Sequence, residues 1–382
     1  MSMTNGDRLR IGLVGCGNIS LAYLLNAEMF DGVSVTACAD LSQAAARARG
    51  DAFGLKVMGT DEILVSPDVD LILNLTVPAA HYDISRRALE AGKHVFTEKP
   101  LSTNTTDGRA LVELARAKGL SIGSAPDTFL GAAGRHARRL IEDGAIGRPV
   151  TGTAFMMGRG MEHWHPDPGF YYQPGGGPVM DMGPYYLSML VNLIGPVRRV
   201  QALATSAHAE RELSAEGPLK GTTIPVGTPT SVSSLLDFAG GAQVTFVTSW
   251  DVYRHTNRQI ELHGTEGSIG LPDPDNFSGI VSLSERGAPW ADLDTAGLPF
   301  GALNWPREAP DRGNYRMLGL ADMATALIEG RPARASGDLA LHVLEIMESI
   351  LKAAETGQPV EVSATECQPA IFSEDDAKRL LS

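Results

Sequence analysis

The first 125 or so residues alternate short apolar runs with longer segments of helical periodicity. Apolar runs predict buried strands at 9–14, 33–39, 70–75, 94–97 and 121–123. Helical patterns separate them at 18–29, 43–49, 79–91 and 106–118. Strands that alternate with helices form βαβ units, whose right-handed crossovers give a parallel sheet with helices on both faces. We therefore predict an α/β domain with a doubly wound parallel sheet over residues 1–127.

The pattern changes after residue 128. A helix is expected at 132–143 and a strand at 149–157, followed by a loop rich in glycine, proline and aromatic residues at 158–177 and a helix near Asp181. Residues 198–270 read mostly as strands, and Ala239-Gly240-Gly241 between two of them is typical of a hairpin. Helical patterns at 315–329 and 338–356 close the chain. We predict that residues 128–382 form an α+β domain around a largely antiparallel sheet, whose C-terminal helix is a candidate to pack back on the first domain.

Composition and charge narrow the class of protein. Hydrophobic residues make up 43% and charged residues 20%, which is typical of a globular protein. The 45 acidic and 32 basic side chains leave a net charge of −13, which disfavours nucleic acids and acidic membranes. No apolar run reaches the roughly 18–20 residues of a membrane helix, and the polar amino-terminal stretch lacks the apolar core of a signal peptide. Three cysteines are too few for a disulfide framework, so we expect a cytoplasmic protein.

A glycine-rich segment, Gly-Cys-Gly-Asn-Ile-Ser at 15–20, lies between the first predicted strand and helix. Glycines here permit a tight turn and let the backbone approach a pyrophosphate at the helix N-terminus, as in a Rossmann dinucleotide site. Asp40 ends the second strand, where a carboxylate can bind both ribose hydroxyls and would repel a 2′-phosphate. This favours NAD over NADP. The alternatives are a glycine turn that binds nothing, with Asp40 capping a helix, and an adenosylmethionine site, which fits the glycines less well.

Glu98-Lys99-Pro100 follows the fourth predicted strand, at the edge where open α/β sheets bind ligands. Lys99 can hydrogen-bond a substrate hydroxyl beside a nicotinamide, and we expect burial and the positive cofactor ring to lower its pKa. Pro100 is a candidate for a cis peptide bond. The alternative is an exposed Glu–Lys pair in a surface loop.

Two further motifs, Pro-x-x-His at 78–81 and Gly-Gly-Gly-x-x-x-Asp-x-Gly at 175–183, follow in order with the glycine turn and Glu-Lys-Pro. In this combination the whole chain resembles the Gfo/Idh/MocA oxidoreductase family. The resemblance implies a nicotinamide domain and a second domain with a large open sheet for substrate binding and for homodimer or homotetramer contacts. It implies that Lys99 is the central catalytic lysine and that Asp181 binds substrate. The family's usual histidine is replaced by Tyr185.

The resemblance also implies which strand-end residues hold the cofactor: Gly15, Gly17, Asn18, Ile19, Asp40, Thr76, Pro78, His81, Glu98 and Lys99. Asp181 and Tyr185 are four residues apart, so a helix places them on one face. A tyrosine is a poor base at neutral pH unless a cation such as Lys99 lowers its pKa. The alternative for Tyr185 is an ordinary core aromatic.

Three more residues are candidates for substrate contact. Asp127 stands where many relatives carry a basic segment, and a carboxylate there suits a neutral sugar; capping of a helix is the alternative. Trp164 and His165 could line a sugar pocket by stacking and hydrogen bonding, or could pack under the loop. His163, His165 and Asp167 do not form a closed set of ligands, so we expect no metal.

These observations predict an NAD-dependent oxidoreductase that transfers hydride between nicotinamide and a secondary hydroxyl of a neutral sugar, glycoside, inositol or polyol. Lys99, helped by Tyr185, would receive the hydroxyl proton while Asp181 orients the substrate. Two alternatives stay open: an NAD-dependent glycosidase that acts by transient oxidation, and a non-catalytic NAD-binding regulator.

Overall fold

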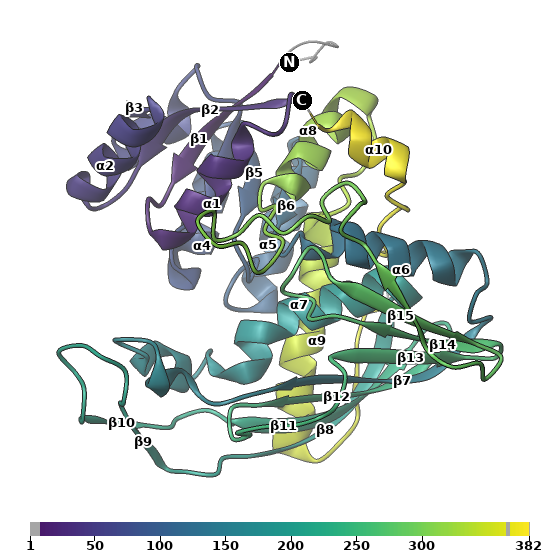
Figure 1. Cartoon of the computed structure of the whole chain (residues 1–382). Coiled ribbons are helices and arrows are strands. Elements are labelled where there is room, and N and C mark those ends of the chain that lie inside the picture. Colours follow the sequence, from purple (N-terminus) through teal and green to yellow (C-terminus); the bar gives the residue numbers. More distant parts are fainter. Residues whose placement is uncertain (1–7, 364–366, 382) are drawn as a thin grey trace.

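Two sheets organise the chain, a parallel sheet of six strands in the amino-terminal third and a mixed sheet of nine strands in the remainder (Figure 1). The computed structural model describes residues 8–363 and 367–381. The first seven residues of the polar amino-terminal stretch therefore lie outside the described part.

The parallel sheet has the strand order β3-β2-β1-β4-β5-β6. Its strands are β1 (Leu9–Val14), β2 (Val33–Ala39), β3 (Lys56–Val57), β4 (Leu71–Asn74), β5 (His94–Thr97) and β6 (Ile122–Ser124). Its helices are α1 (Asn18–Ala27), α2 (Gln43–Phe53), α3 (Thr60–Val65), α4 (Pro78–Glu90) and α5 (Thr105–Ala117). The predicted doubly wound fold is confirmed. The sequence pattern missed the short elements β3 and α3, because two to six residues carry no readable period.

The second sheet has the order β16-β15-β14-β13-β7-β12-β11-β8-β17, and all its pairs are antiparallel except β7 with β12. Its strands are β7 (Pro149–Met157), β8 (Val197–Thr205), β11 (Ser231–Phe238), β12 (Gln243–Ser249), β13 (Ile260–Gly264), β14 (Gly267–Leu271), β15 (Ile280–Glu285), β16 (Ala291–Asp294) and β17 (Val360–Glu361), with a separate small ribbon of β9 (Glu210–Glu212) and β10 (Thr223–Pro225). The helices of this part are α6 (Ala132–Glu142), α7 (Gly177–Ile194), α8 (Leu318–Glu329), α9 (Gly337–Thr356) and α10 (Glu374–Arg379). The α+β class with a large, mostly antiparallel sheet is confirmed.

The predicted hairpin at 231–250 is present as β11 and β12, paired from Ser231 opposite Ser249 to Asp237 opposite Gln243. Alternate positions such as Val232 and Leu236 are buried, on the side where α7 and α9 cover the sheet. On the same strands and on β8, Leu235 and Leu203 remain exposed. One face of the large sheet is therefore core and the other is open.

Hydrogen bonds and a β-bridge join the two parts of the chain at several points. The backbone N–H of Gly319 at the start of α8 donates to the Asp127 carboxylate at 2.8 Å. Asn26 of α1 donates to the carbonyl of Asn314 at 2.9 Å. Near the C-terminus, Leu381 forms a β-bridge with Phe30, so the segment after α10 lies against the first part, close to the amino-terminal strand (Figure 1).

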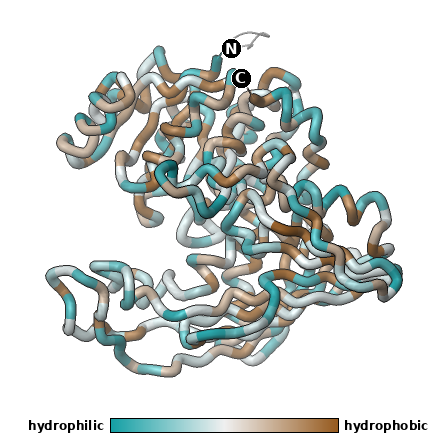
Figure 2. Tube along the Cα trace, in the orientation of Figure 1, coloured by the Kyte–Doolittle hydropathy of each residue, from teal (hydrophilic) through white to brown (hydrophobic). Residues whose placement is uncertain are grey.

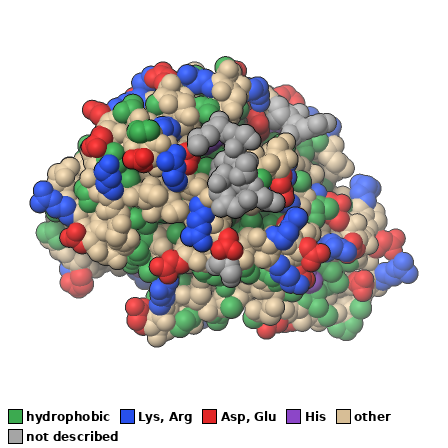
Figure 3. Space-filling view, turned by 90° about the horizontal axis from the view of Figure 1, so that it is seen from above, with side chains coloured by type: hydrophobic (Ala, Val, Ile, Leu, Met, Phe, Trp, Pro, Cys, Tyr) green, Lys and Arg blue, Asp and Glu red, His purple; other side chains and the backbone are tan. Residues whose placement is uncertain are grey.

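The distribution of hydrophobic and charged residues is that of a globular protein. In Figure 2 hydrophobic positions concentrate along the packed strands and helices, whereas many outer turns are hydrophilic. The face seen in Figure 3 carries basic and acidic side chains side by side rather than a field of one sign. Among the described residues no helix is both long and apolar enough to cross a membrane.

Candidate active site

The sequence-predicted cofactor residues gather at one edge of the parallel sheet. Gly15 follows β1, Asp40 follows β2, Thr76 follows β4 and Lys99 follows β5. Because the parallel strands end at the same edge of the sheet, the topology brings the functional residues that directly follow them close together. Most residues of these four strands are buried, so the strand ends are held in place by packing on both faces of the sheet.

The glycine turn has the shape that a dinucleotide requires. Gly15 has φ +102°, and a Cβ there would lie 2.5 Å from the carbonyl oxygen of Leu75. Gly17, by contrast, is exposed and faces open space, with nothing within 4 Å of a Cβ position. Gly17 is the N-cap of α1, and no side chain caps the helix. Free backbone N–H groups beside open space suit a pyrophosphate, so the residues present fit NAD.

Asp40 is held in place next to this turn. Its carboxylate accepts hydrogen bonds from the backbone N–H groups of Cys16 and Ser42, each at 2.7 Å. Each carboxylate oxygen has a second acceptor position, so ribose hydroxyls could still donate to it. The nearby Arg49 guanidinium donates to Ser20 Oγ at 2.9 Å and is thereby tied to the first turn of α1.

The two parts of the chain meet at Lys99 and Asp181. Lys99 Nζ donates to Asp181 Oδ1 at 2.9 Å and to the Asp181 backbone carbonyl at 2.7 Å. The two side chains are 18% and 19% exposed, so the ion pair is sheltered yet accessible. Lys99 Nζ also lies 5.2 Å from the centre of the Tyr185 ring. Asp181 and Tyr185 therefore share the α7 face that meets Lys99, as their spacing predicted. The Lys99–Pro100 peptide bond is cis.

The pKa values of Lys99 and Tyr185 are both raised, whereas the sequence suggested that they would be lowered. Burial works against the charge of Lys99, but the Asp181 carboxylate and its hydrogen bond outweigh burial and raise the Lys99 pKa above its ordinary value. The expected lowering is wrong because it left out this direct ion pair. Burial and the Asp275 charge raise the pKa of Tyr185 more than Lys99 and Arg316 lower it. Lys99 is thus an ammonium and Tyr185 a neutral phenol.

Arg316 belongs to the site although no sequence signal indicated it. Its guanidinium donates to Tyr185 Oη at 3.3 Å and to Asp275 Oδ1 at 3.1 Å. Its side chain is 14% exposed. Glu98 lies in the same cluster and accepts a hydrogen bond from Tyr23 Oη at 2.9 Å. Arg316 precedes α8 in an irregular segment without a motif, so only the fold brings it to Tyr185.

A cavity of about 540 Å³ opens above the Lys99–Asp181 pair. Strand-end residues of the first part line one side of it, and the loop before α7 with the first turns of that helix lines the other. Its lining residues are Val77, Pro78, Ala79, Lys99, Pro100, Thr103, Phe170, Tyr171, Pro174, Gly175, Gly176, Met180 and Asp181. This size is typical of a small-molecule site.

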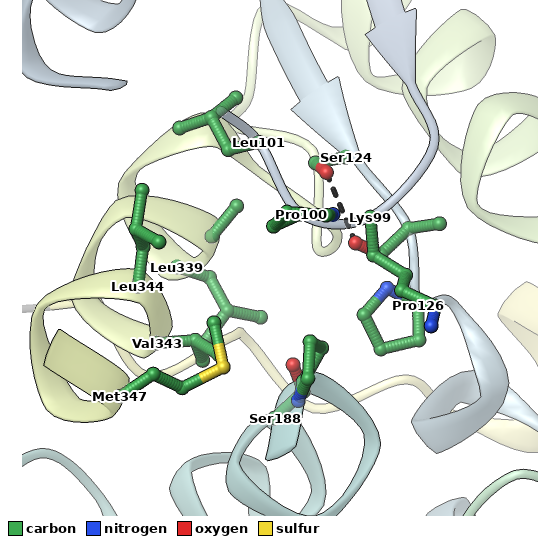
Figure 4. A pocket seen from close by; sticks show the side chains of 13 residues that line it. Lys99, Pro100, Leu101, Ser124, Pro126, Ser188, Leu339, Val343, Leu344 and Met347 are labelled. Atoms are coloured by element: carbon green, nitrogen blue, oxygen red, sulfur yellow. Dashed lines mark hydrogen bonds between the residues drawn. The ribbon is translucent and has the colours of Figure 1, made fainter. Parts of the chain in front are cut away.

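The backbone behind Lys99 is firmly packed. A second, very small cavity of about 10 Å³ lies between Pro100, the α9 side chains Leu339, Val343 and Met347, and Ser188 of α7 (Figure 4). Such a space is at the lower limit for one water molecule. The turn that carries Lys99 therefore has little freedom to move away from Asp181.

His81 and Asp127, which were expected to contact cofactor and substrate, form hydrogen bonds with other parts of the protein instead. His81 is fully buried, and its ring nitrogens lie 2.6 Å from the Pro100 carbonyl and 3.0 Å from the Thr76 carbonyl, so the ring braces these two turns. Asp127 is 1% exposed and binds the Gly319 backbone rather than lining the cavity. Burial raises the pKa of Asp127 to about 6.

The aromatic loop also differs in detail from the expectation. Trp164 and His165 do not line the 540 Å³ cavity. The His165 ring instead contacts the rings of Phe170 and Tyr171 edge-on, with centroids 5.6 and 5.5 Å apart. Phe170 and Tyr171 themselves form the wall. The sequence indicated an aromatic loop but not which rings face inward, because the loop has no regular period.

Within residues 8–363 and 367–381, no group of three or more His, Cys, Asp or Glu side chains is arranged to hold a metal ion.

Comparison with known proteins agrees with this geometry. Residues 9–124 match the oxidoreductase family with an NAD-binding Rossmann fold, and residues 135–270 match the GFO/IDH/MocA C-terminal domain. A dTDP-3,4-didehydro-2,6-dideoxy-alpha-D-glucose 3-reductase of Streptomyces violaceoruber is 32% identical over 268 residues, which cover 69% of this chain and 72% of that protein. Levoglucosan dehydrogenase of Pseudarthrobacter phenanthrenivorans is 28% identical over 388 residues, which cover 93% and 98%.

Solved structures show the same fold. A levoglucosan dehydrogenase in complex with NADH and L-sorbose superposes with a TM-score of 0.80 at 23% identity, covering 94% of this chain and all of that one. An NAD binding oxidoreductase from Klebsiella pneumoniae gives a TM-score of 0.81 at 21% identity, with the same coverage.

Proposed function

Because the chain belongs to the Gfo/Idh/MocA family of oxidoreductases with an NAD-binding Rossmann fold, we propose that it interconverts a secondary hydroxyl and a ketone on a neutral sugar, glycoside, inositol or polyol. The names of its relatives support a sugar substrate. The net charge of −13 supports a neutral one rather than an anionic one. The number of cysteines supports a cytoplasmic location.

The observation that carries the proposal is the Lys99–Asp181 pair. It lies at the 540 Å³ cavity and at the same sheet edge as the glycine turn and Asp40. A cation beside the dinucleotide site can stabilise the reacting oxygen of the substrate, because that oxygen gains negative charge in the transition state. The cavity thus joins the cofactor residues of one part to the substrate residues of the other.

The residues have distinct roles in this reaction. When bound at the glycine turn and Asp40, NAD supplies the acceptor for the hydride of the carbinol carbon. Lys99 Nζ hydrogen-bonds the substrate oxygen, gives it a proton in ketone reduction, and takes the proton in alcohol oxidation once Nζ is neutral. Asp181 orients the ammonium and a neighbouring hydroxyl. Tyr185 keeps its proton and orients Lys99 through its ring and its contact with Arg316.

The test is turnover by a lysine variant. Purified protein is offered sugars, polyols and glycosides with NAD and with NADP, and NADH absorbance is followed. Lys99→Met should lower turnover of any accepted substrate at least about 100-fold. NAD affinity, measured by calorimetry, should change little. Lys118→Met is the matched control, since this side chain is exposed and its Nζ donates to the Glu90 carbonyl at 3.2 Å, outside the cavity lining. Retained turnover in Lys99→Met would overturn the assignment.

The proposed assembly is a homodimer or homotetramer formed through the open face of the large sheet. Leu203 is 75% exposed and Leu235 is 39% exposed on adjacent strands of that face. Apolar side chains that share the open face of a large sheet are candidates for burial between subunits. Light scattering of Leu203→Asp with Leu235→Asp should show a smaller species than the unchanged chain. An unchanged mass would refute this interface.

A further inference from the structure

The lining of the 540 Å³ cavity divides between cofactor and substrate. Val77, Pro78 and Ala79 follow β4 at the sheet edge assigned to the dinucleotide, so this part of the lining belongs to the cofactor. The loop before α7 and the first turns of that helix supply most of the remainder, next to the turn that carries Lys99. A substrate that reacts at Lys99 beside the cofactor therefore contacts the loop and α7.

Polar side chains are scarce in this substrate part of the lining. Its residues are Phe170, Tyr171, Pro174, Gly175, Gly176, Met180 and Asp181. Among them only Tyr171 and Asp181 have a side chain that forms ordinary hydrogen bonds. Because each buried hydroxyl of a sugar needs a partner, these two side chains decide how a sugar is held here.

Both side chains keep an unused hydrogen-bonding atom at the cavity. Asp181 Oδ1 accepts from Lys99 Nζ at 2.9 Å, whereas no residue in the described part of the chain donates to Oδ2. The Tyr171 hydroxyl likewise has no hydrogen-bond partner among the residues that the structure describes. The adjacent Tyr172, by contrast, is fully buried and donates to the Glu162 carboxylate. Tyr172 thus fixes the loop to the core, and Tyr171 leaves its hydroxyl to the ligand.

The Tyr171 phenol is close enough to the Lys99–Asp181 pair to feel both charges. Burial raises the pKa of Tyr171, the Asp181 carboxylate raises it further, and the Lys99 ammonium opposes them. All three side chains line the same cavity. Tyr171 is therefore a neutral phenol that can donate and accept hydrogen bonds where a substrate meets the pair.

Contacts behind the Tyr171 ring hold it in place. The Phe170 and Tyr171 rings lie 4.1 Å apart with an interplanar angle of 31°. His165 and buried Trp250 contact the Tyr171 ring edge-on, with centroids 5.5 and 6.0 Å away. A side chain that is already packed loses little entropy when a ligand binds, so its hydroxyl can discriminate between ligands.

We propose that Tyr171 determines specificity by binding, together with Asp181 Oδ2, the hydroxyl on the carbon next to the one that reacts. The substrate is then a vicinal diol in oxidation and an α-hydroxy ketone in reduction. Lys99 Nζ binds the reacting oxygen, and Asp181 lies directly beside it, so a hydroxyl on the adjacent carbon reaches Oδ2. That hydroxyl donates to the carboxylate and accepts from the phenol. The inference rests on the proposed function for the identity of the reacting oxygen and for the path of hydride and proton.

The test is a thermodynamic cycle between the Tyr171 hydroxyl and single hydroxyls of the ligand. Calorimetry on the NADH-saturated protein compares glucose, galactose, mannose, xylose and myo-inositol with their monodeoxy derivatives. For the parent that binds most tightly, loss of one hydroxyl should weaken binding about tenfold or more, because the carboxylate loses a partner. Tyr171→Phe should weaken binding of this parent at least about fivefold, and binding of that deoxy derivative less than about twofold. A role in shaping the loop alone would weaken both by the same factor.

Turnover locates the hydroxyl that couples to Tyr171. Its deoxy derivative should still be oxidised, because the reacting hydroxyl is kept, and Tyr171→Phe should lower kcat/KM for the parent mainly through KM. Tyr253→Phe is the matched control, since it removes the same group from a side chain that is 85% exposed, lies 5.5 Å from the Arg159 guanidinium and is outside the cavity lining. This variant should leave affinities and KM unchanged.

The inference is overturned if no parent binds, if Tyr171→Phe changes the affinities of parents and deoxy derivatives by the same factor, or if the coupled deoxy derivative is not oxidised although its parent is. Failure of the proposed function has a different signature. Coupling of Tyr171 to one hydroxyl without turnover of any parent would refute the oxidoreductase reaction and leave the hydroxyl site standing. Turnover without such coupling would do the reverse.

Discussion

The two glycines of the turn after β1 should respond differently to substitution by alanine: Gly15→Ala should lose stability, and Gly17→Ala should lose NAD affinity. In Gly15→Ala the new Cβ would lie 2.5 Å from the carbonyl oxygen and 2.6 Å from the carbonyl carbon of Leu75, and 2.8 Å from the Thr76 nitrogen. All three are backbone atoms, so no side-chain rotation relieves the contact. The φ of +102° itself costs about 1–3 kcal/mol for a residue with a Cβ. We expect a total loss above about 3 kcal/mol, because the end of β4 must also move.

Gly17→Ala is the control with the same added methyl group. Its φ of −69° and ψ of −169° are open to alanine, and nothing lies within 4 Å of the new Cβ. Only the weaker preference of alanine at an N-cap remains, which costs less than about 1 kcal/mol. The methyl group instead enters the open space assigned to the pyrophosphate, so NAD affinity should fall about tenfold or more while the fold is preserved.

Thermal melting and NAD calorimetry on both variants separate the two effects. Gly15→Ala should lower the apparent Tm by roughly 5–10 °C, whereas Gly17→Ala should lower it by no more than about 3 °C. NAD binding should be weakened in Gly17→Ala at temperatures where the protein is fully folded. Equal melting temperatures would refute the steric argument at Gly15, and unchanged NAD affinity in Gly17→Ala would refute the pyrophosphate position.

Three further predictions concern the charges of the site. Asp181→Asn removes the carboxylate that raises the pKa of Lys99, so the rise of alcohol oxidation with pH should move to lower pH; an unmoved profile of kcat against pH would contradict the ion-pair argument. The pKa of Asp127 lies at about 6, above its unfolded value, so its ionisation weakens folding as the pH rises from about 4 to 6; the Tm of Asp127→Asn relative to the unchanged chain should increase from pH 5 to 7, and a constant difference would refute this. Tyr185→Phe removes one of the acceptors of Arg316 but keeps the ring beside Lys99, so kcat should fall about tenfold while the Tm stays within about 3 °C; an unchanged kcat would show that the phenol does not position Lys99.

The sequence was most informative where regular structure and chemistry coincide. β1, β2, β5 and β7 have the predicted bounds, because each is a compact run bordered by clear turn residues. The same regularity predicted that Gly15, Asp40 and Lys99 lie together, because residues that directly follow parallel strands all lie at the carboxyl edge of the sheet. The helical spacing of Asp181 and Tyr185 likewise put both beside Lys99.

The remainder depends on contacts between residues far apart in the chain. The protonation of Lys99 follows from an ion pair that joins β5 to α7, which no local pattern encodes. Arg316 reaches Tyr185 across 131 residues, and the burial of Asp127 against Gly319 spans 192. Phe170 rather than Trp164 faces the cavity because the loop before α7 follows no period that would orient its rings.

The division of the cavity between rigid strand ends and an irregular loop bears on how such a chain can evolve. Lys99 and the glycine turn are fixed by a buried parallel sheet, and changes there disturb the reaction itself. Residues 158–176, which include Phe170 and Tyr171, lie outside the long helices and the large sheet and carry much of the cavity wall. Substitutions and insertions in that loop can alter what is bound without moving the lysine. New substrates are thus within reach of few mutations, and the same loop is the natural target for redesign of specificity.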